Sequence, residues 1–556
     1  MAKKDIEVPS KQRALVFQGG GSLGAYEAGV YHVLYHWIKK DLLSDNENVF
    51  DIIAGTSIGA VNASIIINEI LEKKQQDKSL TQKGKSNTIL SYWEDTPKKL
   101  IHFWKDVSSS SNNIIDAWDP WDLSDIYRSF IENYLKFNYG MYLNIFPYLR
   151  SLVPSEESFR KYYHTQMALA YGEKHIFRPL FIYPFSTPGS NKFFDYSSPT
   201  AKWFQYTNLP LRNSISNSAN MLKDDNNQKG IKTNYDEKEP RLLLIAVDIG
   251  EAESRTFDSY KENITINHVL ASAAVPKNYP YVDIDGNKYW DGGILSNTPI
   301  REVLSEHSKL WVERLEIDSD SKKELSYEKE KEWFKKDKDN QNKKDDIPNL
   351  ELCIVNLYPS NEKGEQIPSL YDYDLTKDRE NDIRFHDKTE YDIKLANVIS
   401  DYHDFVERMG ELAINAIEEI KNKNELVANL KKEFIDILGE KQRTLTRNEE
   451  PRYYYDLLQK RFNIEKTIEI QRQDDTDTIA NKALDFSSET IDKLIEQGIY
   501  DTLDKLYQDQ KEKLKNDKES ITKFEKWLSN YIKDLEKQNT KDLLKSVLNF
   551  KDKERL

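Results

Sequence analysis

Two strand–turn–helix units follow one another in the first 71 residues, and this pattern constrains the fold more than any other feature of the chain. An apolar run over 13–18 leads into the glycine-rich loop 19–24 and then into a segment with apolar residues at helical spacing. A second apolar run over 49–54 leads through a tight turn into another segment of helical spacing. Strands that alternate with helices in this way predict an α/β fold with a parallel sheet.

The glycine loop is compatible with two different anions. Gly19, Gly21 and Gly24 satisfy the G-x-G-x-x-G pattern that cradles a dinucleotide's pyrophosphate. A dinucleotide site also requires an acidic residue at the far end of the second strand, about twenty positions after the glycines. Here the only acid of that strand, Asp51, stands near its beginning. The loop is therefore expected to hold the developing oxyanion of a reaction and not a pyrophosphate.

The second strand ends in Gly55-Thr56-Ser57-Ile58-Gly59, which matches the G-x-S-x-G nucleophile elbow. Such an elbow presents its serine hydroxyl at the top of the sheet, and its glycines let strand and helix cross closely. The helix that follows directs the positive end of its dipole toward the same point. Ser57 is thus the candidate nucleophile, although a glycine–serine turn entering a helix is the plain structural alternative.

Attack by Ser57 on an acyl carbonyl would require hydrogen-bond donors for the tetrahedral oxygen, each contributing about 3 to 4 kcal/mol. The backbone amides of Gly19, Gly20 and Gly21 are expected at the end of the neighbouring strand. The amide of Ile58 directly follows the nucleophile. These four amides are the predicted oxyanion hole.

A general base must lie close to the nucleophile, and an aspartate is a better candidate than a histidine. Asp285-Gly286 predicts a hairpin turn between two short strands, and Asp291 follows the second of them directly before Gly292 and Gly293. Partial burial would raise the carboxyl pKa from its usual value of about 4. Asp248 at the end of another apolar run is a rival acid, and His268 stands in an expected helix.

Composition limits the compartment and the partners. Cys353 is the single cysteine and lies in an apolar run, so a buried structural thiol is expected and an intramolecular disulfide is excluded. The net charge of -14 disfavours nucleic acid and general recruitment to anionic lipid. Because no stretch of about 18 apolar residues occurs, a cytoplasmic protein is predicted, with peripheral membrane contact at most.

The chain is longer than one hydrophobic core usually supports, which is about 250 to 300 residues. Apolar, polar and charged segments alternate along it, and the tryptophans Trp118 and Trp121 stand in an unusually aromatic stretch. The predicted segments are 1–91, the first part of the α/β core with the oxyanion loop and the elbow; 92–200, an aromatic-rich helical cap; 201–384, the second part of the core with polar insertions at about 205–240 and 316–347; and 385–556, a charged helical C-terminal region.

Four short motifs together resemble the patatin-like phospholipase family. They are Gly19-Gly20-Gly21-Ser22-Leu23-Gly24, Gly55-Thr56-Ser57-Ile58-Gly59, Ala271-Ser272-Ala273-Ala274-Val275-Pro276 and Asp291-Gly292-Gly293, in that order. The resemblance covers about residues 10–310 together with 350–357, and it is to the bacterial type with a C-terminal helical extension. Leu23 stands where the family often has Arg or Lys, which puts any contribution of that cation in doubt here.

The resemblance implies a three-layer hydrolase-like fold and a Ser-Asp dyad without histidine. Ser57 would be the nucleophile, Asp291 the base, and Gly19 to Gly21 the oxyanion loop. Gly24, Gly55, Gly59, Gly292 and Gly293 would support these motifs. The substrates would be lipid esters such as phospholipids or lysophospholipids, and the chemistry would use no metal and no cofactor.

The sequence therefore predicts a lipid acyl hydrolase, a serine carboxylic-ester hydrolase that works through a covalent acyl-enzyme. Two alternatives stay open at this point. One is acyl transfer to an acceptor other than water. The other is a non-catalytic lipid- or protein-binding scaffold in which the site is vestigial. The aromatic region 92–196 would cover the acyl pocket or touch a membrane surface through Trp118 and Trp121, and ordinary packing of a cap is the plain structural alternative.

Overall fold

The computed structural model describes residues 8–80, 88–108, 172–179, 206–223, 230–315, 347–359, 373–386, 389–420, 424–440, 464–472, 481–513, 519–537 and 540–554, with 161, 164–165, 168–169, 327 and 462 in addition. The chain divides into two compact units. Unit 1 comprises residues 1–14, 300–352 and 388–468. Unit 2 comprises 15–299, 353–387 and 469–556. Each unit is described by itself.

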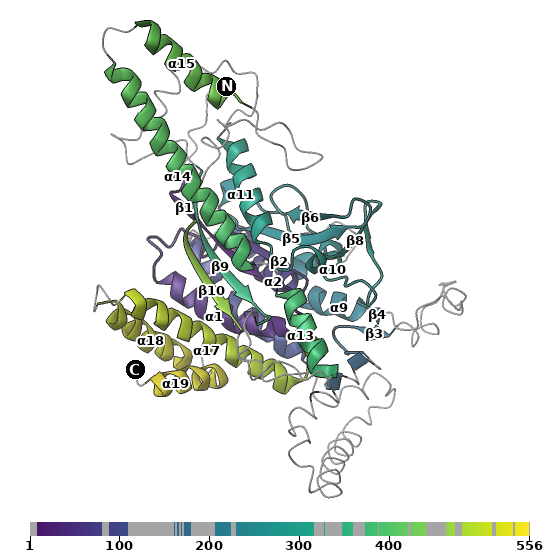
Figure 1. The fold of residues 1–556 in the computed structure, drawn as a ribbon. Helices are drawn as coiled ribbons and strands as arrows, with labels where there is room; N and C mark the ends of the chain where they lie inside the picture. Colours follow the sequence, from purple (N-terminus) through teal and green to yellow (C-terminus); the bar gives the residue numbers. More distant parts are fainter. Residues whose placement is uncertain are drawn as a thin grey trace, which may run out of the picture. The chain divides into compact units, whose positions relative to one another are not determined.

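The described part of the chain has an α/β fold with one large mixed sheet (Figure 1). Its order is β10-β9-β1-β2-β5-β8-β7, and β6 pairs with β5. The bounds are β1 Lys11–Phe17, β2 Ile52–Thr56, β5 Arg241–Asp248, β6 Glu253–Asp258, β7 Val282–Ile284, β8 Asn287–Asp291, β9 Asn349–Asn356 and β10 Ile464–Gln471. A separate pair consists of β3 Arg178–Pro179 and β4 Tyr206–Thr207.

Helices account for most of the remaining described residues. The longer ones are α1 Gly24–Lys39, α2 Ile58–Leu80, α3 Ile89–Trp93, α4 Thr96–Val107, α9 Leu209–Ser218, α10 Ile266–Ser272, α11 Ile300–Arg314, α13 Tyr373–Phe385, α14 Thr389–Glu419, α15 Asn424–Leu438, α17 Ser488–Lys513, α18 Glu519–Lys537 and α19 Lys541–Glu554. Short 3-10 turns include η1 Gly21–Leu23, η5 Asn220–Leu222, η6 Tyr235–Glu237, η7 Gly292–Ile294 and η9 Lys482–Leu484.

Sheet register in unit 2 brings the predicted nucleophile and base toward each other. β2 and β5 are parallel, with Thr56 opposite Ile245. β5 and β8 are antiparallel, with Ala246 opposite Asp291. Because neighbouring strands lie about 4.8 Å apart, Ser57 and Asp291 are separated by about two strand spacings at one end of the sheet.

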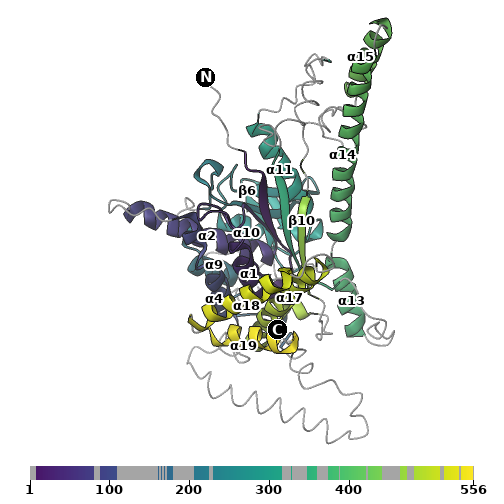
Figure 2. The same ribbon diagram turned by 90° about the vertical axis from the view of Figure 1, so that its left-hand side faces the viewer.

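The C-terminal helices are part of unit 2. α17 packs along α1, and Figures 1 and 2 show α17, α18 and α19 gathered beside α1. The two helices cross closely, since a Cβ added at Gly498 would collide with the main-chain oxygen of Tyr26. The sequence has apolar residues at helical spacing in this segment, and they are buried in α17, as are Ile499 and Tyr507: Ile491, Leu494, Ile495, Leu503 and Leu506.

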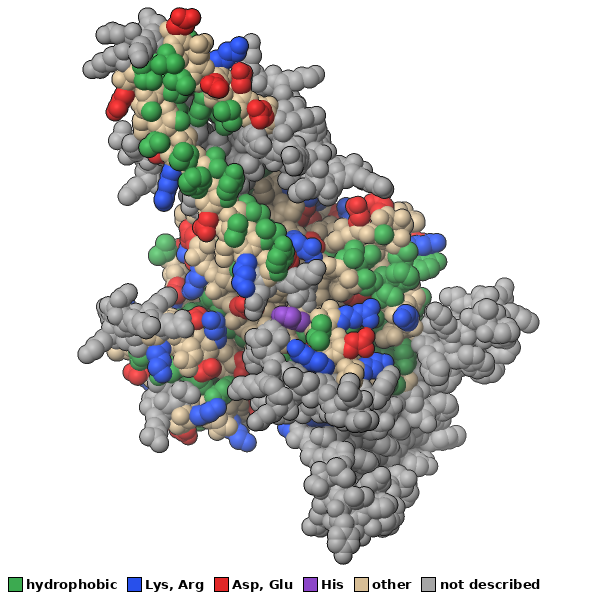
Figure 3. Space-filling view, in the orientation of Figure 1, with side chains coloured by type: hydrophobic (Ala, Val, Ile, Leu, Met, Phe, Trp, Pro, Cys, Tyr) green, Lys and Arg blue, Asp and Glu red, His purple; other side chains and the backbone are tan. Residues whose placement is uncertain are grey.

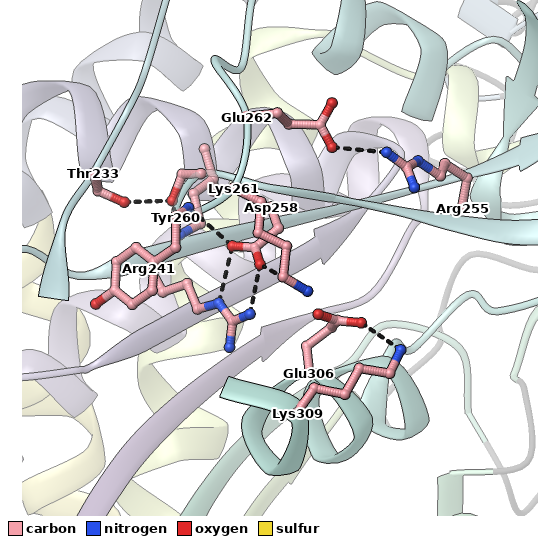
Figure 4. A network of polar contacts seen from close by, with 11 residues as sticks. Thr233, Arg241, Arg255, Asp258, Tyr260, Lys261, Glu262, Glu306 and Lys309 are labelled. Atoms are coloured by element: carbon pink, nitrogen blue, oxygen red, sulfur yellow. Dashed lines mark hydrogen bonds and ion pairs between the residues drawn. The ribbon is translucent and has the colours of Figure 1, made fainter. Parts of the chain in front are cut away.

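A buried ion pair lies at the start of β5 in unit 2. Arg241 at the start of β5 donates from Nε to Asp258 Oδ1 at 2.9 Å, and its Nη2 lies 2.5 Å from Asp258 Oδ2 (Figure 4). The Arg241 amide also donates to Asp51 O at 2.8 Å, just before β2. These bonds tie the start of β5 to the segment that enters β2, and so they fix the register that leads to Ser57.

Unit 1 contains a helical pair with its own small apolar cluster. The cluster consists of the buried residues Tyr327, Ile414 and Ile417 (both of α14) and Leu438 (of α15), and other apolar residues of α14 and α15 pack against it. The helical spacing of Leu426, Leu430, Phe434, Ile435 and Leu438 in the sequence predicts one apolar face, and Gly439 predicts the helix end. Gly439 donates its amide to Ile435 O at 2.9 Å where α15 ends, whereas Leu426 is 44% exposed.

Several predicted boundaries differ from the structure. The second strand starts at Ile52 and not at Val49. The polar composition of residues from about 75 to 90 predicts a linker there. The helix after Ser57 instead continues to Leu80, because its Glu, Lys and Gln residues are good helix formers. The polar insertion at 205–240 contains α9. Strand β10 lies within a segment that was expected to be helical, and its Ile464, Ile468 and Ile470 follow a two-residue period.

Other expectations are confirmed. The single cysteine is buried in β9. The hairpin turn between β7 and β8 has Asp285 at φ +53° and Gly286 at φ +88°, the left-handed values of a tight two-residue turn. Most of the predicted cap at 92–200, including Trp118 and Trp121, and nearly all of 316–347 lie outside the described residues.

Candidate active site

Ser57 occupies a strained turn between β2 and α2. Its φ is +55°, a left-handed value that non-glycine residues rarely adopt. A Cβ at Gly59 would lie 2.7 Å from the main-chain oxygen of Phe17, so helix and strand cross with no space for a side chain. Strain of this kind persists only where the surroundings impose it, and it is common at functional sites. A serine on a strained strand-to-helix turn is the geometry that the predicted nucleophile elbow requires.

The glycine loop lies directly beside the elbow. A Cβ at Gly19 would come within 2.9 Å of Ser57 Cβ. The Gly19 amide is already used, because it donates to Asn297 O at 3.2 Å. The amides of Gly20, Gly21 and Ile58 make no hydrogen bond to any other residue that the structure describes. Three of the four predicted oxyanion donors are thus open in this conformation, and Gly24 begins α1 behind them.

Asp291 ends β8 and is 4% exposed. Its Oδ1 accepts the Gly293 amide at 2.7 Å in the turn that Gly292 begins. Burial raises the pKa of Asp291 from 3.8 to about 6, while hydrogen-bond contributions from the Ser57 side chain and the Gly293 amide act in the opposite direction. Oδ2 is buried and makes no fully formed hydrogen bond within the described part of the chain. The Ser57 side chain thus influences the pKa of the Asp291 carboxyl group, although no formed hydrogen bond joins the two side chains among the described residues.

Residues at the end of α10 form hydrogen bonds to the main chain of both Ser57 and Asp291. Ser272 Oγ accepts the Ser57 amide at 3.0 Å and donates to Ile245 O at 2.6 Å. Two residues later, Ala274 O accepts the Asp291 amide at 2.9 Å. Ser272 is fully buried. The sequence analysis names this segment only as a family motif, and the structure identifies Ser272 as the residue that fixes the backbone of Ser57.

Asn297 is a site residue that the sequence analysis does not single out. It is 4% exposed, and its side-chain amide donates to Gly19 O at 3.1 Å and to Phe385 O at 2.7 Å. Together with the bond from the Gly19 amide to Asn297 O, this clamps the start of the glycine loop. The one sequence signal available was a polar residue six positions after Asp291 in an otherwise short turn.

A C-terminal segment supports the glycine loop from the other side. Ser22 Oγ donates to Lys482 O at 3.0 Å. The Lys482 ammonium is itself buried, 3.2 Å from Asp378 Oδ1 and 2.7 Å from Asp382 Oδ1 of α13. A Cβ at Gly21, whose φ is +58°, would collide with Ala483 O. The loop conformation is therefore set by residues more than 450 positions away.

The rival acid and the histidine have other structural roles. Asp248 Oδ1 accepts the Gly250 amide at 2.8 Å and the Glu251 amide at 3.2 Å, which makes it a turn residue. His268 Nδ1 accepts the Thr265 amide at 3.0 Å in the capping box of α10. Neither contacts Ser57 among the interactions of the described residues. Leu23, where a cation was in question, is buried.

No group of three or more His, Cys, Asp or Glu residues suited to holding a metal ion occurs in the described ranges. A search of the described helices for segments long and apolar enough to cross a membrane likewise finds none.

Comparison with known proteins gives one family match. No curated protein matches the chain. VipD from Legionella pneumophila is a solved structure similar at 11% identity over 98% of this chain and 79% of that chain, but at a TM-score of 0.23 this similarity carries no argument. The model of the family described as "Patatin: Patatin-like phospholipase" matches residues 15–304, which include every predicted site residue. The chain belongs to the patatin-like phospholipase family.

Proposed function

We propose that this protein is a lipid acyl hydrolase that cleaves carboxylic esters with Ser57 as nucleophile and Asp291 as general base. The proposal rests on one observation above all. A serine held at φ +55° at a strand end lies beside a buried carboxyl group whose pKa is raised to about 6. A base with a pKa in this range is largely ionised at neutral pH and remains basic enough to take a proton.

The first half of the reaction forms an acyl-enzyme. Ser57 Oγ attacks the ester carbonyl carbon while its proton passes to the Asp291 carboxylate, and the carbonyl π electrons move onto the oxygen. The amides of Gly20, Gly21 and Ile58 stabilise that oxyanion. The bond to the alcohol oxygen then breaks as the tetrahedral intermediate collapses, and the leaving alcohol takes the proton from Asp291.

The second half releases the fatty acid. A water molecule gives its proton to Asp291 and attacks the acyl carbon, and the same three amides hold the second oxyanion. Collapse of this intermediate returns the proton to Ser57 Oγ, which restores the free enzyme. An ester needs no metal for these steps, since the main-chain amides supply the electrostatic stabilisation.

The amide of Gly19 has a supporting role in this proposal. It is bonded to Asn297 O, so it holds the loop and leaves oxyanion binding to the two glycines after it. The Ser272 hydroxyl likewise positions the Ser57 backbone without contacting substrate.

Purified full-length chain should be assayed on a panel of phospholipids, lysophospholipids and neutral lipid esters, with free fatty acid and acylated acceptors both quantified. Ser57→Ala and Asp291→Asn should each abolish fatty-acid release. Matched controls are Ser254→Ala, an exposed serine of β6, and Asp248→Asn, the carboxyl group at the end of the neighbouring strand. Both controls should retain activity.

A fluorophosphonate probe gives a substrate-independent reading of the same site. Labelling of the wild type that disappears in Ser57→Ala would support a reactive serine. Labelling that persists in Ser57→Ala, or a folded wild type that neither labels nor hydrolyses any ester, would overturn the proposal. Acylated acceptor in place of free acid would assign the chain to acyl transfer.

A further inference from the structure

Helix α14 of unit 1 exposes a long apolar stripe. Eight large apolar side chains of this helix, Ile399 among them, are between 44% and 64% exposed. Hydrophobic side chains follow the helix along the face seen in Figure 3. We call the other seven residues the α14 stripe: Tyr391, Leu395, Val398, Tyr402, Phe405, Met409 and Leu412. Contiguous exposed apolar surface of this kind marks an interaction site more often than a solvated face.

The spacing of the α14 stripe is that of a coiled coil. The intervals between successive members are 4, 3, 4, 3, 4 and 3 residues, without an interruption. This is the alternation of heptad positions d and a over three heptads, with Tyr391, Val398, Phe405 and Leu412 at d. A helix that merely lay on a globular core would bury its apolar face.

The core-facing side of α14 is a different one. Asp392 Oδ2 forms an ion pair with Arg301 Nε of α11 at 3.1 Å. Ile414 and Ile417 pack in the buried cluster with α15. These residues occupy other heptad positions than the α14 stripe. Unit 1 thus holds α14 as a helix through one side and leaves the seam on another side uncovered among the described residues.

The charges beside the α14 stripe indicate which partner helix would pack on it. Lys394, Asp401 and Arg408 fall at the g positions, whereas Ile399 and Val406 fall at e. In a parallel pair of α14 helices, each g charge would face an apolar e residue of the other helix. In an antiparallel pair g faces g, and Asp401 of each copy meets Arg408 of the other, twice across the interface.

The same antiparallel register also fills the core. It sets every a residue opposite a d residue of the other copy, with Tyr402 against Phe405, Met409 against Val398, Leu395 against Leu412 and Ala416 against Tyr391. Both core layers and charges are satisfied by one alignment of the sequence with itself. We infer that α14 mediates self-association, as an antiparallel two-helix coiled coil with α14 of a second copy of this chain.

The inference is independent of the proposed hydrolysis and is tested by association alone. The full-length chain should show a concentration-dependent monomer–dimer equilibrium in sedimentation velocity. Asp401→Arg places Arg against Arg in both charge pairs, and Arg408→Asp places Asp against Asp. Each single variant should raise the dissociation constant at least tenfold.

Mixing the two single variants is the decisive measurement. In a mixed antiparallel pair all four groups meet opposite charges, so an equimolar mixture should recover dimer that neither variant forms alone. The double variant D401R/R408D should also dimerise like the wild type. Far-ultraviolet circular dichroism and thermal melting control for folding of every variant.

Three results would overturn the inference. A wild type that stays monomeric at all accessible concentrations is one. Dimer that is unaffected by both charge reversals, and by Val398→Glu with Phe405→Glu, is the second. The third is a mixture of the single variants that remains monomeric while the wild type dimerises.

Discussion

Ser22 of the glycine loop donates its hydroxyl hydrogen to the main-chain oxygen of Lys482 at 3.0 Å, across 460 positions of sequence. The bond joins the candidate oxyanion loop to a segment that the sequence assigns to a separate C-terminal region. The loop's open amides belong to Gly20 and Gly21, which directly precede Ser22. Residues far outside the predicted catalytic core therefore determine where those donors point.

Removing the Ser22 hydroxyl should impair catalysis more than stability. Ser22→Ala leaves the Lys482 carbonyl without its donor and loosens the loop. We expect a loss of stability of about 1 kcal/mol and a fall in kcat of about tenfold with little change in KM, since the oxyanion forms only in the transition state. The measurements are chemical denaturation and steady-state ester hydrolysis.

Ser64→Ala is the matched control for Ser22→Ala. Ser64 is equally buried and its hydroxyl also donates to a main-chain oxygen, that of Ala60, at 2.7 Å. It lies within α2 and not in the loop. A comparable loss of stability with unchanged kcat is expected, and an equal fall of kcat in both variants would mean that the Ser22 effect is only structural.

Replacing Lys482 should have a larger effect. Its ammonium lies between the carboxyl groups of Asp378 and Asp382, and all three residues are buried. Lys482→Met leaves two buried carboxyl groups without their cation, which should cost about 3 to 5 kcal/mol of stability. Thermal melting of the variant checks this, and the triple variant with Asp378→Asn and Asp382→Asn should regain part of the loss.

The pKa of Asp291 predicts the pH dependence of the reaction. With the carboxyl pKa raised to about 6 by burial, the base is protonated below that value and ionised above it. The half-buried Tyr279 and the buried Tyr358 interact electrostatically with Asp291, but desolvation raises their own pKa values, so both stay neutral at neutral pH. The rate of fluorophosphonate labelling should rise through about pH 6 and level off above pH 7.

A different pH profile would identify a different base. A labelling rate that rises near pH 4 would mean that Asp291 is solvated in the working enzyme. A rise near pH 8 or above would exclude a carboxylate as the group that activates Ser57. Asp248→Asn, the matched carboxyl control, should leave the profile in place.

Much of this site follows from short-range sequence patterns. The first two strands, the glycine loop and the elbow all lie between Arg13 and Gly59. Their order along the chain predicts that Ser57 ends a strand next to the one that leads into Gly19. The hairpin turn at Asp285 and Gly286 similarly places Asp291 at a strand end. Local propensity decides these elements, and the sheet register then brings their ends together.

The supporting contacts depend on chain segments that approach only in three dimensions. Asn297 and Lys482 contact backbone groups of distant residues and belong to no periodic or motif pattern of their own. Ser272 stands in a family motif, but the motif does not reveal that its hydroxyl binds the Ser57 amide. The use of the Gly19 amide by Asn297 O is a further example, because a glycine motif does not reveal which of its amides is already bonded. β10 was missed because charged residues alternate with its isoleucines in a strongly charged region.

The burial that makes Asp291 a candidate base should also make it a source of instability. A folded-state pKa of about 6, against 3.8 for the free side chain, means that the folded protein binds a proton more tightly than the unfolded chain. Stability from this group is therefore present below about pH 4 and is lost as pH rises through 6. Two pKa units correspond to about 3 kcal/mol.

Asp291→Asn should accordingly be inactive and more stable than the wild type at pH 8, where the carboxylate carries its full burial cost. The amide keeps the side-chain oxygen that accepts the Gly293 amide. The gain should reach about 3 kcal/mol at pH 8 and shrink toward zero at pH 4, measured by denaturation at both values. Asp248→Asn is the control, since that carboxyl group caps a turn and should show no such gain. A variant that is less stable than the wild type at pH 8 would mean that the Asp291 carboxylate is stabilised in the fold, and that its basicity does not come from burial.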